Sequence, residues 1–304
     1  GEDENDPVLC ITDLLIHLSG EQLEKKAAKV IEGEQLDILV GSRPLAGTEK
    51  ESVKANILKL LENKYQITEE DFLSAELEIV PAGKAKNSGI DSSMIMAYGQ
   101  DDRVCAYTSL AAMLEVEDPE RTTCCLLVDK EEIGSVGATG MQSHFFENMV
   151  AEVLNLMGEY SELNVRRCLA SSCMLSSDVS SAFDPTYAAS FDKKNVAYLG
   201  GGMVFNKFTG ARGKSGSNDA NAEYLAHIRN IFEKENIHFQ TAELGRVDLG
   251  GGGTIAYILA LYGMNVIDSG VAVLNMHAPW EAVSKADVYE TKRGYVAFLK
   301  GAAI

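Results

Sequence analysis

Metal-seeking side chains stand directly after apolar runs at four places in this 304-residue chain. They are Asp102, the pair Glu131-Glu132, Asp178 and His277. Zinc binds carboxylate oxygen and imidazole nitrogen, and paired divalent ions can polarise a carbonyl and ionise a water. The four segments together predict a two-metal site that hydrolyses an amide bond.

Each of these residues also has an ordinary structural explanation when it is considered alone. Asp102 could be a cap of the helix that is expected to run onward from Val104. Glu131 and Glu132 could form a solvated turn, and a lone histidine such as His277 is often a core residue. Adjacent residues on an extended segment point to opposite sides, so that one glutamate can bind metal while the other faces a substrate.

The elements that must position these side chains follow an alternation of strand-like and helix-like stretches. Strands are expected at 124–128, 168–176, 265–268 and 271–276, and helices at 145–156, 219–235, 254–261 and 281–299. This alternation predicts a layered α/β fold with helices flanking a sheet. Ligands of such sheets bind at the carboxyl ends of strands, where three of the four metal-seeking segments lie.

The first third of the chain has a different character from the rest. The spacing of apolar residues predicts a helix over 51–63, and alternation predicts a strand over 75–80. A Gly/Ser/Lys-rich stretch at 81–93 is the expected linker. We therefore expect one domain over 1–92 and a second over 93–304.

The composition limits the partners and the compartment of this protein. A formal net charge of -18 argues against nucleic acid or an anionic membrane surface as partner. The six cysteines show no Cys-x-x-Cys spacing, and free thiols indicate a reducing compartment. No charged-then-apolar signal segment opens the sequence. We expect a cytoplasmic protein.

The ordered set of motifs resembles the aspartyl aminopeptidase family over nearly the whole chain. The matching segments are Gly99–Arg103, Glu131–Ser135, Ser177-Asp178 with Asp184-Pro185-x-Tyr187, Arg246-x-Asp248, Gly252-x-Thr254-Ile255 and Met276-His277. The resemblance implies a three-layer, zinc-peptidase-like catalytic domain and part of a smaller interface (dimerisation) domain. It also implies two divalent ions, zinc with cobalt or manganese as alternatives, peptide substrates, and a homo-oligomeric shell built from dimers.

The resemblance also implies a role for each candidate site residue. Asp102 would bridge the two metal ions, and Glu131 would be the general base. Glu132 and His277 would complete one metal position, whereas Asp178 would help to hold the other.

The remaining metal ligand of the family is a histidine in a Ser/Ala-His-Thr-Asp-like segment ahead of the interface domain. No such segment occurs here. We expect either that the amino-terminal part of the family is missing from this chain or that a missing stretch has been closed up in the numbering. The polypeptide alone would then be weakly metallated and inactive. The alternative is a non-catalytic assembly or cargo scaffold, against which the intact general base Glu131 argues.

Substrate recognition in this family implies a cation in the pocket, because the substrates are acidic. The basic run 207–214 supplies Lys207 and Arg212 as candidates, unless it is only a solvated loop. Gly252 lies in a glycine run that would let the backbone approach a substrate. His17 matches an interface-segment histidine that reaches a neighbouring subunit's active site, although a core or surface histidine is the other explanation.

Overall fold

Two compact units make up the chain in this computed structural model, which describes residues 5–210, 216–246 and 248–302. One unit is Gly1–Lys84 and the other is Ala85–Ile304, so the division falls inside the glycine-rich stretch 81–93. Strand β3 (Lys86–Ser88) pairs with β4 (Met94–Ala97), which ties the residues after Lys84 to the second unit. The interface and catalytic roles of the two parts stay predictions.

The first unit contains little regular structure. Its strands β1 (Cys10–Ile11) and β2 (Ile38–Leu39) pair antiparallel. Its helices are α1 (Gly20–Leu23), α2 (Ser52–Tyr65) and four 3-10 turns at Ile16–Leu18, Ala27–Lys29, Gly33–Gln35 and Glu70–Leu73. Helix α2 confirms the helix predicted over 51–63, whereas the strand predicted over 75–80 is irregular chain. Many apolar side chains of this unit are exposed, including Leu14, Leu15, Ile16 and Leu18.

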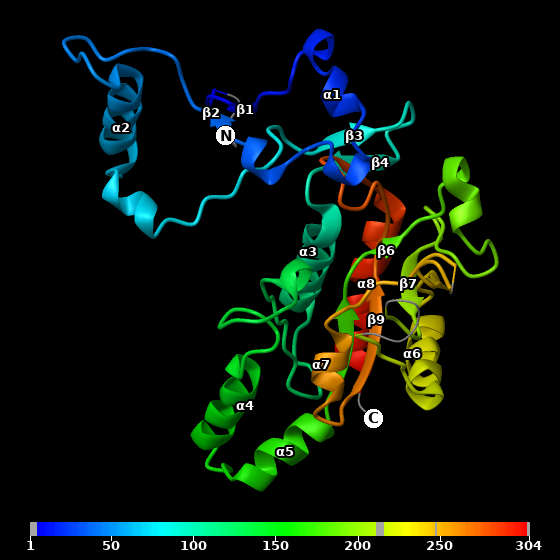
Figure 1. The fold of residues 1–304 in the computed structure, drawn as a ribbon. Coiled ribbons are helices and arrows are strands. Elements are labelled where there is room, and N and C mark those ends of the chain that lie inside the picture. The colour runs from blue at the N-terminus through cyan, green and yellow to red at the C-terminus, as the bar shows by residue number, and fades with distance from the viewer. Residues whose placement is uncertain (1–4, 211–215, 247, 303–304) are drawn as a thin grey trace. The chain divides into compact units, whose positions relative to one another are not determined.

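The second unit is built on two mixed sheets (Figure 1). The five-stranded sheet has the order β3-β4-β11-β10-β6, with β11 (Glu281–Ser284) between β4 and β10 (Ala272–Leu274), and β6 (Ser180–Ser181) at an edge. The four-stranded sheet has the order β5-β9-β7-β8, formed by β5 (Cys173–Ser177), β9 (Asn265–Gly270), β7 (Met203–Asn206) and β8 (Phe239–Thr241). Strands β5 and β9 run parallel, as do β7 and β8.

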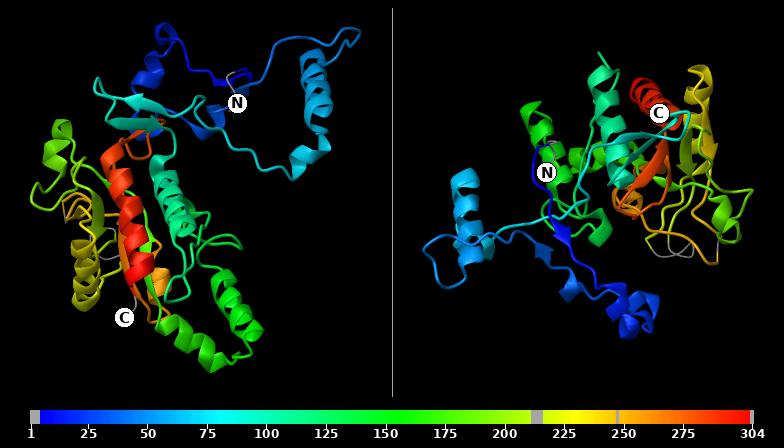
Figure 2. Two further views of the ribbon diagram at one scale, coloured as in Figure 1. Left: turned by 180° about the vertical axis from the view of Figure 1, so that it is seen from behind. Right: turned by 90° about the horizontal axis from the view of Figure 1, so that it is seen from above.

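Helices flank these sheets, as the sequence predicts. They are α3 (Gln100–Glu115), α4 (Phe145–Leu156), α5 (Glu162–Ala170), α6 (Ala222–Lys234), α7 (Ala256–Ala260) and α8 (Lys285–Gly301), with 3-10 turns at Glu131–Ile133 and Pro185–Ser190. Helix α8 packs against α3, α6 and β7, and Figure 2 shows it lying along the strands. Across the described residues, no helix combines the length and the apolar character that crossing a membrane requires.

Helix α6 illustrates how the sequence builds this packing. Its buried residues Tyr224, Ile228, Ile231 and Phe232 follow helical spacing, so they form one apolar face. Asn221 caps the helix by accepting the Tyr224 backbone N–H at 2.7 Å. The buried face joins the main core, where the rings of Phe232 and Phe205 lie 5.3 Å apart.

In the second unit, three predicted elements differ from the structure. The strand predicted over 124–128 pairs with no strand among the described residues. The first part of the strand predicted over 168–176 ends helix α5, and only the second part forms β5. The helix predicted over 281–299 begins with strand β11, because its backbone pairs with β4 on one side and β10 on the other.

Strand β9 ends in a glycine that lies unusually close to a neighbouring backbone. A Cβ added at Gly270 would lie 1.9 Å from the carbonyl oxygen of Asp178 and 2.8 Å from the sulfur of Cys105. Asp178 also donates its backbone N–H to Ser269 at 3.0 Å. The segment that carries Asp178 is therefore held directly against the end of β9.

Candidate metal centre

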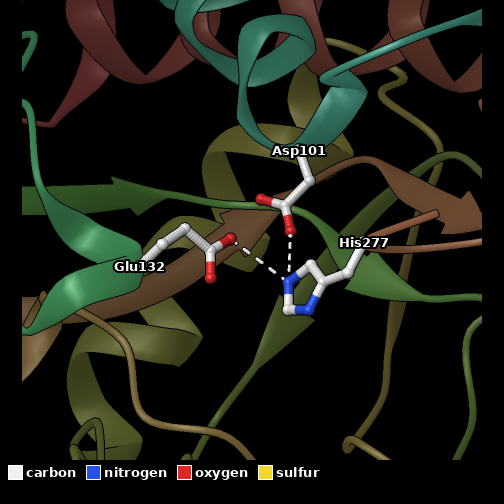
Figure 3. A group of neighbouring side chains, drawn as sticks. All are labelled: Asp101, Glu132 and His277. Atoms are coloured by element: carbon white, nitrogen blue, oxygen red, sulfur yellow. Dashed lines mark ion pairs between the residues drawn. The ribbon is translucent and has the colours of Figure 1, made fainter. Parts of the chain in front are cut away.

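Three side chains from distant parts of the second unit meet at one imidazole. The Nε2 atom of His277 lies 2.9 Å from Oδ2 of Asp101 and 3.2 Å from Oε1 of Glu132 (Figure 3). Asp101 stands at the start of α3, Glu132 on the 3-10 turn Glu131–Ile133, and His277 in the loop between β10 and β11. The Asp101 side chain is 9% exposed, whereas those of His277 and Glu132 are 62% and 59% exposed, so the group opens toward solvent on the side of these two residues.

Unusual backbone conformations occur at the residues that carry these side chains or beside them. Asp101 and Asp102 have non-helical angles although they stand in the first turn of α3. The turn that carries Glu132 lies between Lys130 and Gly134, both with positive φ. His277 itself has a φ of 65°, which non-glycine residues rarely adopt. Such backbones persist only where the surroundings hold them, and they often accompany functional sites.

A second group of acids adjoins the first. Oxygen atoms of Asp101, Asp102 and Asp178 lie within 4.8 Å of one another, as do the ligand atoms of Asp101, Glu132 and His277. Asp101 is thus the member common to both groups. The structure brings Glu132 and His277 together with Asp101, whereas Asp102 takes part only in the carboxylate group.

The crowding of acids changes their proton affinity. Burial, followed by the charge of Glu132, raises the pKa of Asp101 to about 6. Burial raises the pKa of Asp102 to about 8, and burial with the charge of Asp102 raises the pKa of Asp178 well above its usual value. The pKa of Glu131 is also raised, by burial first and by Glu132 second. The charge of His277 acts in the opposite direction on the pKa values of Asp101 and Glu131, but it does not offset burial and the neighbouring acids.

The donor set fits a divalent cation. Asp101, Glu132 and His277 supply two carboxylates and one imidazole, the mixed oxygen and nitrogen ligation that zinc accepts. The Oδ1 atom of Asp102 is buried without a hydrogen-bond partner. A buried acceptor without a partner is costly, and a cation would satisfy it.

Two cavities border this cluster. One has a volume of about 270 Å³ and is lined by Asp101, Glu131, Glu132, Asp178 and His277 together with Asn206, Phe208, Thr209, Gly210, Glu243 and Gly252. Its described lining contains no lysine or arginine. The other cavity has a volume of about 490 Å³, and both apolar residues and acids, among them Asp102 and Asp178, line it. Glu131 lies in the wall of both cavities, beside the two acid groups.

The residues predicted to bind substrate lie in different parts of the chain, and not all of them line a cavity. Gly252 lines the smaller cavity, as a substrate-contacting glycine would. Lys207 forms an ion pair with Asp219 at 2.5 Å and is absent from the described cavity linings. Arg212 lies outside the described residues. His17 belongs to the first unit, in the 3-10 turn Ile16–Leu18.

Sequence reasoning missed three acids at this site. Asp101 was passed over in favour of its neighbour, although two adjacent acids at a helix start were a visible signal. Glu281 was hidden in a predicted helix, and its buried carboxylate accepts the backbone N–H groups of Asp101 and His277. Glu243 lines the smaller cavity with a pKa raised to about 7, mainly by burial, and no motif pointed to it.

The raised pKa values predict how the stability of the metal-free chain varies with pH. Asp102 and Asp101 bind protons more tightly when folded, so the stability they contribute at acid pH is lost as pH rises from about 4 to about 8. Replacing Asp102→Asn should stabilise the chelator-treated protein at pH 8 by at least about 1 kcal/mol more than at pH 5. Urea denaturation at both pH values measures this difference.

The exposed Asp91 is the matched control, since its pKa is lowered by hydrogen bonds from Ser93 and its removal should give no gain at pH 8. An Asp102→Asn protein that is no more stable at pH 8 than at pH 5, relative to the unmodified chain, would contradict the crowding of ionised acids.

Known proteins resemble this chain over almost all of its length. The model of the family described as aminopeptidase I zinc metalloprotease (M18) matches residues 1–299. The probable M18 family aminopeptidase 1 of Clostridium acetobutylicum is 66% identical over 300 residues, which cover 98% of this chain and 64% of the relative. That of Thermotoga maritima is 46% identical over 299 residues, covering 98% of this chain and 65% of the relative. This chain thus spans just under two thirds of the length of these relatives.

Solved structures agree with these similarities. The crystal structure of aminopeptidase I from Clostridium acetobutylicum superposes with a TM-score of 0.90 at 65% identity, covering 98% of this chain and 65% of that one. The crystal structure of the M18 family aminopeptidase from Thermotoga maritima gives a TM-score of 0.93 at 44% identity, covering 98% and 66%. With a family model matched from residue 1 to residue 299, the chain belongs to the M18 family of aminopeptidase I zinc metalloproteases.

Proposed function

We propose that this protein is a metal-dependent aminopeptidase that hydrolyses the amino-terminal residue from peptides. The observation that carries the proposal is the cluster of Asp101, Glu132 and His277 beside the carboxylate of Glu131 in one cavity wall. Membership of the M18 family supports the same activity. The acidic lining of the smaller cavity, including Glu243, suits the positively charged amino terminus of a peptide.

The ligands of two divalent ions are assigned as follows. Asp101, Glu132 and His277 would hold one ion, and Asp102 and Asp178 would hold the other together with Asp101, which belongs to both groups. This arrangement moves the shared position from Asp102 to Asp101. Zinc fits the donor set, with cobalt and manganese as alternatives. When bound, such ions supply a Lewis acid for the peptide carbonyl and lower the pKa of a water.

Glu131 is proposed as the general base and acid. It is half-buried between two cavities and its pKa is raised by burial and by Glu132, which makes its carboxylate a better proton acceptor. It takes a proton from the attacking water and returns that proton to the leaving amine. Its neighbour Glu132 contacts His277, so the two adjacent acids divide the tasks of base and ligand.

A preference for acidic amino-terminal residues is the finer part of the proposal. Lys207 is the basic residue of the run 207–214 that lies within the described residues. To bind an acidic substrate side chain, it would have to give up its ion pair with Asp219. Arg212 is the second proposed cation of the basic run, and Gly252 provides close approach of the backbone. His17 is proposed to reach the active site of a neighbouring subunit. Cytoplasmic location and assembly from dimers are also proposed, the first from six free cysteines and the second from the exposed apolar residues of the first unit.

The two groups predict unequal metal affinity in the 304-residue polypeptide. One group contains an imidazole, whereas the other contains carboxylates alone among the described residues. Elemental analysis after dialysis should give about one tightly held zinc per chain, with little or no hydrolysis of an amino-terminal aspartate amide. Two tightly held ions with peptidase activity would contradict this. No metal under any condition would favour the scaffold alternative.

The role of Glu131 is tested at saturating zinc, where mass action also fills the weaker group. Replacing Glu131→Gln should lower kcat about 100- to 10,000-fold, because the amide cannot accept the proton of water. Zinc content should be unchanged. The exposed Glu162, paired with Arg166 on α5, provides the control Glu162→Gln with full activity. A Glu131→Gln protein that retains kcat would refute the general-base role.

Acidic specificity is tested by replacing Lys207→Met. The KM for an aspartate amide should rise about tenfold, the value of one lost charge interaction of about 1.4 kcal/mol, while the KM for an alanine amide stays unchanged. Lys194, a lysine on the loop that precedes Val196, provides the control Lys194→Met. An equal change in both KM values would show that Lys207 supports the loop and does not read the substrate.

A further inference from the structure

Glu281 is a buried acid with an unusual pair of partners. Its residue is 2% exposed, and its two carboxylate oxygens accept different backbone N–H groups. Oε2 accepts the N–H of Asp101 at 2.9 Å, and Oε1 accepts the N–H of His277 at 2.7 Å. Among the described residues, no lysine or arginine is recorded in an ion pair with Glu281.

The position of Glu281 in the sheet explains this reach. It is the first residue of β11, the strand between β4 and β10. Asp101 follows the end of β4 after a short turn, and His277 lies in the loop that connects β10 to β11. One side chain on the middle strand thus touches the backbones that leave both neighbouring strands.

We propose that Glu281 is a positioning residue that sets the spacing between Asp101 and His277 so that both can bind one cation. This inference rests on the proposed function, because it assumes that these two side chains are metal ligands. Both stand on irregular backbone, Asp101 in the distorted first turn of α3 and His277 with a φ of 65°. Such segments have several accessible conformations, and a shared acceptor restricts both at once.

The energetics favour this role over simple filling of space. Burying a carboxylate is unfavourable unless strong hydrogen bonds compensate, and charge-assisted bonds to N–H groups do so. An apolar side chain could fill the same volume at less cost, but it would leave both N–H groups without an acceptor. The hydrogen bonds that stabilise the buried Glu281 carboxylate therefore come from Asp101 and His277, whose side chains lie 2.9 Å apart.

Asp287 provides a matched control within the same unit. It is fully buried, and its two oxygens accept the N–H groups of Gly200 and Gly202 at 2.8 Å each. The chemistry is that of Glu281, a buried carboxylate that accepts two backbone N–H groups, although both donors here belong to one turn. Neither Gly200 nor Gly202 belongs to the two cation groups. Loss of one bond at Asp287 should therefore affect stability without affecting metal binding.

The experiment compares Glu281→Gln, Glu281→Asp and Asp287→Asn in the whole chain. Glutamine keeps the volume but offers one acceptor oxygen, whereas aspartate keeps the charge but shortens the reach. Zinc affinity is measured by calorimetric titration. Both Glu281 variants should bind zinc about 10- to 100-fold more weakly, while Asp287→Asn should match the unmodified chain. Thermal melting confirms that each variant is folded.

A metal-free measurement separates this inference from the proposed function. Amide hydrogen exchange at Asp101 or at His277, followed by fragmentation mass spectrometry, should be at least about tenfold faster in Glu281→Gln, because one of the two protecting acceptors is lost. Unchanged exchange would overturn the positioning role. Equal loss of zinc affinity in Asp287→Asn, or full affinity in Glu281→Asp, would also overturn it. An unmodified chain that binds no zinc would instead refute the proposed function.

Discussion

Repulsion among acidic side chains is the constraint on which this site depends. Asp101, Asp102 and Asp178 bring carboxylate oxygens within 4.8 Å of one another, and Glu131 and Glu132 stand beside them. Burial first, and the neighbouring carboxylates after it, raise the pKa values of these acids, so they cannot all ionise unless positive charge is present. The fold thus holds together acids that would move apart in a flexible chain. A divalent cation bound between them would remove the repulsion.

The scaffold resists this repulsion by anchoring the acids to three elements: Asp101 and Asp102 to α3, Glu131 and Glu132 to the 3-10 turn Glu131–Ile133, and Asp178 to the end of β5. Asp178 directly follows strand β5. The last residue of that strand, Ser177, forms a hydrogen bond of 2.5 Å with the hydroxyl of Tyr295. Tyr295 is buried on α8 and also donates to the carbonyl of Ser269 on β9 at 3.2 Å. One core helix therefore fixes the ends of two parallel strands next to the acid cluster. Precision at the centre comes from packing that is remote from any ligand.

Sequence patterns predicted the parts of this protein that depend on local order. Helices α2 and α4 follow from apolar spacing, and the acids that end apolar runs do gather at one place. The distinction between Asp101 and Asp102 was beyond sequence reasoning, because it depends on backbone angles at the distorted start of α3. Glu281 was mistaken for the start of a helix, since strand β11 is defined by pairing with β4 and β10 and not by its own composition.

Gly270 shows how a residue without functional groups can control chemistry at a distance. The carbonyl oxygen of Asp178 occupies the space that any side chain at this position would need. A genetic screen for loss of function would therefore place Gly270 among the essential positions, next to the acids themselves. It would be wrong to read such a result as a catalytic role for Gly270. The residue is needed only because the backbone of Asp178 can approach strand β9 this closely where β9 carries no β-carbon.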